Sequence, residues 1–131
     1  YIGKDLKGTL KEIGRSMNLA LKAHFEKKKF MQNLLDTDGS PMRNLGTISD
    51  DGTPYIDLKK STYIVGNIGL NEAVQVLTGK ELHDSEEAYD TGLKIIAFMY
   101  QKIHEFKKKR HFLLIAILSI DPALIASKGN A

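Results

Sequence analysis

The stretch YIVGNIGLNEAVQVLTGKELHDSEEAYDTG, residues 63–92, decides the fold of this chain. It begins inside the segment STYIVGNIGL, residues 61–70, which has the apolar, β-branched composition of a buried strand. The following EAVQVLTG has the length of a short helix, which Asn71 is predicted to cap and Gly79 to close. The stretch therefore predicts a strand that leads through a glycine-containing loop into a helix.

A second long helix is predicted to follow, from Asp84 to Arg110. Asp84 and Glu87 have the spacing of a capping box. An apolar stripe then continues at helical spacing through Tyr89, Leu93, Ile96, Met99, Tyr100, Ile103 and Phe106. The next segment, FLLIAILSI (residues 112–120), is predicted to be a strand buried on both faces. The two strands and the helices between them predict a right-handed βαβ crossover.

The sequence before the βαβ crossover predicts a helix and a hairpin. Residues 5–36 are predicted to form one long helix, because apolar residues recur at alternating spacings of three and four: Leu6, Leu10, Ile13, Met17 and Leu21. Residues 47–58 are expected to form a short β-hairpin with Asp51 and Gly52 at its turn and Pro54 in an edge strand. The predicted fold is therefore α+β and mainly helical, with two long helices, a short β-hairpin and one or two buried strands.

Composition limits the classes of function. A chain of 131 residues is typical of one domain, so we expect a single domain over residues 1–131. Cysteine is absent, which excludes disulfides, thiolate zinc sites and cysteine nucleophiles within this chain and fits a cytoplasmic protein. The formal net charge of +3 is too small to indicate nucleic acid by itself. The longest apolar run has about half the length of a membrane-spanning helix, so we expect no membrane partner.

The histidines lack the spacing of metal ligands: His24, His83, His104 and His111. The carboxylates of HDSEE, residues 83–87, are explained by helix capping and by the helix dipole. We therefore expect the chain's own residues to hold no metal and no cofactor.

Two basic runs lie near the predicted C-terminal ends of the long helices, where positive charge complements the helix dipole. One is formed by residues 27–29 and the other by Lys107, Lys108, Lys109 and Arg110. Charge runs are usually solvated faces. If the two helix ends converge, however, these residues could form a phosphate-binding patch.

The segment GNIGLNEA, residues 66–73, could either bind a ligand or shape the chain. Glycines at the end of a strand let the backbone approach a ligand closely, and ligands of parallel sheets bind outside the carboxyl ends of the strands. The residues of this segment that could form the wall of a substrate site are Gly66, Asn67, Gly69, Asn71 and Glu72. A strand exit, a bend and a helix cap explain the same residues equally well.

Residues 63–99 strongly resemble the catalytic subunit of the anaerobic (class III, glycyl-radical) ribonucleoside-triphosphate reductase family. The upstream segments ALKAHFEKKKFMQNLL and GTISDDGTPYIDLKKSTYIVG are similar to the segments that precede this motif in the family. The resemblance covers about residues 6–106 in order, and residues 107–131 diverge. It implies part of a ten-stranded α/β barrel that reduces ribonucleoside triphosphates by radical chemistry.

In this resemblance, the family's G-x-x-G-L-N-E run, which lies near the substrate, is matched by Gly66, Gly69, Leu70, Asn71 and Glu72. The cysteines, the glycyl-radical motif and the four-cysteine zinc site of the family have no counterpart in this chain. Pro122 and Ala123 fit the family's phosphate-binding loop, whereas Leu124 and Ile125 replace its Glu and Ser. The resemblance therefore implies a truncated or remnant relative that is catalytically silent alone, with no catalytic residue of its own.

Three functions remain open from the sequence. The reductase relative could bind a ribonucleoside triphosphate weakly or associate with a complementary reductase chain. The chain could instead be a basic module that binds phosphates or nucleic acid, or a structural domain that only self-associates. Because the apolar stripes exceed what the few strands can cover, we expect a homodimer, buried mainly through the helix from Asp84 to Arg110 and the strand of residues 112–120.

Overall fold

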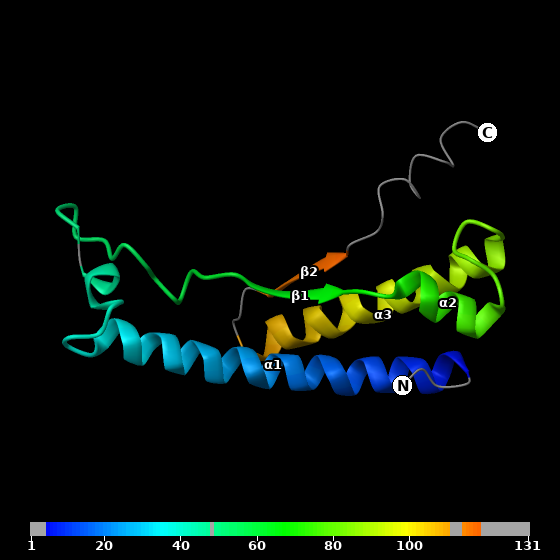
Figure 1. Cartoon of the computed structure of the whole chain (residues 1–131), viewed down its shortest axis with the longest axis horizontal. Coiled ribbons are helices and arrows are strands. Elements are labelled where there is room, and N and C mark those ends of the chain that lie inside the picture. Colours follow the sequence, from blue (N-terminus) through cyan, green and yellow to red (C-terminus); the bar gives the residue numbers. More distant parts are fainter. Residues whose placement is uncertain (1–4, 48, 111–113, 119–131) are drawn as a thin grey trace.

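A computed structural model describes residues 5–47, 49–110 and 114–118, with the side chains of residues 5–47 and 49–107. The elements, in chain order, are α1 (Leu6–Asp36), the 3-10 helix η1 (Arg43–Gly46), β1 (Tyr63–Asn67), α2 (Leu70–Thr78), α3 (Glu86–Arg110) and β2 (Leu114–Leu118). The fold is mainly helical, as predicted. Figure 1 shows α1 and α3 lying alongside each other, with the two short strands running along the helices.

Helix α1 confirms the prediction of a long N-terminal helix. The Asp5 side chain caps it by accepting a hydrogen bond from the Gly8 amide at 2.6 Å, which satisfies one of the amides that have no partner within the first turn. The helix ends at Asp36, and the backbone of the next residue, Thr37, is extended. None of the helices in the described ranges is both long enough and apolar enough to cross a membrane.

The predicted hairpin forms its turn but not its strands. The Ser49 amide donates to the Thr53 carbonyl at 2.8 Å, the Tyr55 amide donates to the Thr47 carbonyl at 3.3 Å, and Gly52 occupies the turn with φ +80°. The described residues of this segment form no strand, only an isolated bridge at Pro54. Because Pro54 has no amide proton, it cannot extend the ladder of hydrogen bonds.

The two strands confirm a parallel crossover. Strand β1 pairs with β2 in parallel, with Tyr63 opposite Leu114 and Asn67 opposite Leu118. Strand β1, which was predicted to be buried, alternates between half-buried and exposed residues, and Ile64 is 48% exposed. The prediction that residues 112–120 are buried on both faces concerns side chains outside the described residues. A barrel is not present in the described part of the chain, where this sheet is the only one.

The helix caps differ from the predicted ones. Gly69, with φ +86°, occupies the N-cap position of α2 in place of Asn71, while Gly79 closes α2 with φ +75° as predicted. At the start of α3, Ser85 Oγ accepts a hydrogen bond from the Ala88 amide at 3.3 Å, so Ser85 replaces Asp84 as the cap. The Asp84 carboxylate instead accepts from the Glu81 amide at 2.9 Å, inside the preceding turn.

The core lies where α3 meets α1, α2 and the segment before α3. Its buried residues are Met17, Val74, Leu82, Ala88, Ile95, Met99 and Ile103. The predicted apolar stripe on α3 included residues from two faces of the helix. Tyr89, Leu93 and Tyr100 are 41%, 44% and 57% exposed, so they do not belong to its buried face. Ile95, which the prediction omitted, is 2% exposed and lies at the centre of the core face.

Candidate functional site

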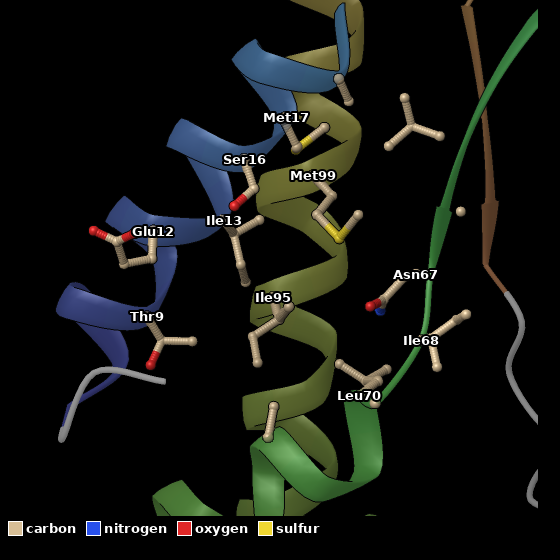
Figure 2. Close-up of a pocket in the computed structure, with 15 residues that line it drawn as sticks. Thr9, Glu12, Ile13, Ser16, Met17, Asn67, Ile68, Leu70, Ile95 and Met99 are labelled. Atoms are coloured by element: carbon tan, nitrogen blue, oxygen red, sulfur yellow. The ribbon is translucent and has the colours of Figure 1, made fainter. Parts of the chain in front are cut away.

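A groove lies at the carboxyl end of β1, between this strand, α1, α3 and the start of α2. It has a volume of about 390 Å³. Its lining residues are Thr9, Glu12, Ile13, Ser16, Met17, Ala20, Val65, Gly66, Asn67, Ile68, Gly69, Leu70, Ala73, Ile95 and Met99. We call this site the strand-exit groove (Figure 2).

Three of the five predicted wall residues line this groove: Gly66, Asn67 and Gly69. In Figure 2 the Asn67 side chain points from β1 toward the apolar side chains of α3. The backbone at Gly69 has φ +86°, a conformation that residues with a Cβ atom rarely adopt. Glycine is therefore required for the chain to turn here from strand to helix. A Cβ atom at Gly66 would meet no atom within 4 Å, which leaves the backbone there open.

The other two wall residues do not line the groove. Asn71 Oδ1 accepts a hydrogen bond from the Leu82 amide at 3.0 Å, which joins α2 to the segment before α3. Glu72 is exposed in the first turn of α2, where its negative charge interacts favourably with the helix dipole. The structure therefore gives both residues a contribution to local stability.

No sequence motif indicated that α1 would form one side of the groove. Thr9, Glu12 and Ser16 supply its polar atoms, and Ile13 and Met17 supply part of its apolar floor. These positions recur at helical spacing on one face of α1. Polar residues that border an apolar helical stripe could have indicated a groove wall, but the strand that completes it lies about 50 residues further along the chain.

The groove is nearly neutral. No Lys, Arg or His is among the described residues that line it. Its one carboxylate, Glu12, is paired with Arg15 Nε at 3.0 Å. A site with an apolar floor and a few hydroxyl and amide groups suits a neutral, polar group of a small molecule better than a phosphate group.

The predicted phosphate patch is described only in part. Lys107 is exposed near the C-terminal end of α3, whereas the side chains of Lys108, Lys109 and Arg110 lie outside the described residues. His111 and the predicted phosphate loop around residues 122–125 lie outside them as well. Within the described ranges, no group of three or more His, Asp or Glu side chains could hold a metal ion.

The groove lies at the carboxyl end of a strand in a βαβ crossover, the position at which ligands of parallel sheets usually bind. The sequence model of the anaerobic ribonucleoside-triphosphate reductases matches residues 2–119, and the chain belongs to that family. The matched range is longer than the segment of residues 6–106 that carries the resemblance in sequence. No curated protein and no solved structure matches the chain.

Proposed function

We propose that this chain forms part of the nucleotide site of an anaerobic ribonucleoside-triphosphate reductase and is catalytically silent by itself. The observation that carries the proposal is the position of Gly66, Asn67 and Gly69, which line the strand-exit groove together with α1. These residues belong to the part of the sequence that the family model matches.

The chemistry of the groove fits a nucleoside. Ile13, Met17 and Met99 offer an apolar surface for a base or a sugar ring, and Ser16 and Asn67 offer hydrogen bonds to its hydroxyl and amide groups. The phosphates need positive charge that the described lining residues do not supply. We therefore expect weak binding of a ribonucleoside triphosphate to this chain alone, and tighter binding when a complementary reductase chain adds cations.

The reduction step needs a thiol radical in this family, as the resemblance implies, and this chain contains no cysteine. We expect no deoxynucleotide when the purified chain is incubated anaerobically with a ribonucleoside triphosphate, a reductant and a radical-generating enzyme. Measurable turnover by the chain alone would contradict the proposed silence.

Binding is tested by titrating the full chain with a ribonucleoside triphosphate and following the backbone amides by NMR. We expect saturable shifts at Asn67 and Gly69. The variant Ser16→Phe should abolish them, because the ring enters the groove from α1. The matched control is Asn18→Phe, an exposed position that does not line the groove. Equal binding by both variants would show that the nucleotide does not occupy the groove.

We also propose that the chain forms a homodimer through the outer face of α3. Tyr89, Leu93 and Tyr100 share this face at spacings of four and seven residues, and each is at least two-fifths exposed. An apolar stripe of this kind is typical of an interface, and identical chains most often pair about a two-fold axis.

A further inference from the structure

A second pocket, with a volume of about 360 Å³, lies at the opposite end of β1 from the strand-exit groove. Its described lining residues are His24, Lys27, Lys28, Met31, Leu58, Ser61, Thr62, Tyr63 and Ile64. We call it the basic pocket. It shares no described lining residue with the strand-exit groove, so the two are separate sites.

The cationic side of the basic pocket is one face of α1. His24, Lys27, Lys28 and Met31 follow the spacing i, i+3, i+4 and i+7, which places them together on the helix surface. His24 fixes this face against β1, because its Nε2 donates to the Ile64 carbonyl at 3.1 Å and its ring meets the Tyr63 ring edge to face at 5.4 Å. The two lysines are therefore held beside the start of the strand.

The described lining of this pocket is basic. No carboxylate is among its described lining residues, while two lysines and a histidine are. Glu26, the acidic residue nearest to them in sequence, pairs with Lys29 at 3.0 Å.

Strand β2 returns the chain from α3 to the edge of this pocket. Only three residues separate Arg110 from Leu114, and Leu114 pairs directly with Tyr63, which lines the pocket. The backbone of the C-terminal end of α3 is therefore only a few residues of chain from the pocket, and the side chains of residues 108–110 lie outside the described residues.

We propose that the basic pocket binds the phosphate group of a small phosphate ester, with Lys27 and Lys28 as the cationic ligands. Lysine binds phosphate as a point charge, and the Thr62 hydroxyl at the pocket rim is of a kind that hydrogen-bonds phosphate oxygens. Met31 and Leu58 provide an apolar wall for the organic part of the ester. The volume lies within the range of small-molecule sites.

The test is a titration of the full chain with inorganic phosphate, against chloride at equal ionic strength, followed by NMR of the His24 ring and the Thr62 and Tyr63 amides. We expect saturable shifts with phosphate alone. Lys27→Ala combined with Lys28→Ala should weaken binding by about tenfold or more, because each charge-assisted hydrogen bond is worth about that factor. Lys11→Ala combined with Lys22→Ala, two exposed positions of α1 outside the pocket, is the matched control and should bind as the unaltered chain does.

Three outcomes would overturn the proposal. Shifts that rise linearly with phosphate and equal those with chloride would show screening only. Equal loss of binding in the test and control variants would show a general surface effect. Affinity for a single-stranded oligonucleotide that grows with its length, and that Lys27→Ala with Lys28→Ala abolishes, would show that the pocket serves nucleic acid. None of these results depends on the strand-exit groove, so failure here leaves the proposed nucleotide site intact.

Discussion

Asn71 and Leu82 are joined by a hydrogen bond in which the Leu82 amide donates to Asn71 Oδ1 at 3.0 Å. The bond crosses the turn between α2 and α3 and holds Leu82 in the core, where its side chain is 9% exposed. Asn71, which the sequence predicted to lie in the wall of a substrate site, therefore contributes to the packing of the fold.

Replacing Asn71 with Ala should lower the free energy of unfolding by about 1–2 kcal/mol, because the partly buried Leu82 amide loses its acceptor. Urea unfolding followed by circular dichroism measures this loss. Asn71→Asp keeps an acceptor oxygen and should retain more of the stability, and Asn18→Ala, at an exposed position of α1, serves as the control. Full stability of Asn71→Ala together with lost nucleotide binding would instead assign Asn71 to the ligand site.

Gly92 allows Leu82 to pack directly against α3. A Cβ atom at Gly92 would lie 2.3 Å from Leu82 Cδ2 and 3.6 Å from Val74 Cγ2. Gly92→Ala should therefore be destabilising: overpacking costs about 1–3 kcal/mol, whereas the gain in helix propensity is at most about 1 kcal/mol. Thermal unfolding measures the net effect.

The matched test of the Gly92 prediction is a double-mutant cycle with Leu82→Ala, which removes the atom that Cβ overlaps. We expect the double variant to be less destabilised than the sum of the two single variants, because the overlap is gone. Strict additivity would mean that Leu82 is not the neighbour that limits residue 92.

Asp51 makes the loop before β1 sensitive to acid. The Ser49 hydroxyl, above all, and then the Thr53 hydroxyl and amide donate to its carboxylate, and these bonds lower the pKa of Asp51 from 3.8 to about 2. The folded loop favours the charged form of Asp51. The contribution of this carboxylate to stability is therefore complete above its ordinary pKa of 3.8 and is lost as the pH falls through about 2. The amide shift of Thr53 should follow this transition by NMR.

Asp51→Asn should remove the acid transition at Thr53, since the amide side chain does not titrate in this range. A transition in the unaltered chain centred at pH 3.8 would show that the hydrogen bonds do not favour the charged carboxylate.

The proposed dimer is tested on the outer face of α3. Leu93→Glu combined with Tyr100→Glu should give a folded monomer by light scattering, because both side chains are exposed in the single chain and their replacement leaves the core intact. Lys94→Glu, at a neighbouring exposed position, is the control. Ile103 is unsuitable for this test, since it is 4% exposed in the chain's own core and Ile103→Asp should unfold the protein. An unaltered chain that is monomeric at micromolar concentration would contradict the proposed dimer.

The sequence by itself determined the features that depend on neighbouring residues. Helical periodicity located α1 and α3, the glycine at position 79 ended α2, and glycines at the end of β1 pointed to the strand-exit groove. These signals are local, because a helix or a turn is set by residues a few positions apart.

The tertiary structure decided what depends on distant neighbours. Asn71, Asp84 and Ser85 all have side chains that can cap a helix. Asn71 and Asp84 instead accept hydrogen bonds from the Leu82 and Glu81 amides, so of the three only Ser85 caps a helix. The buried face of α3 depends on where α1 and α2 pack, so the sequence could not exclude Tyr89 and Tyr100 from it. The basic pocket likewise exists only because α1 packs against β1 and brings His24 to Ile64, 40 residues further along the chain.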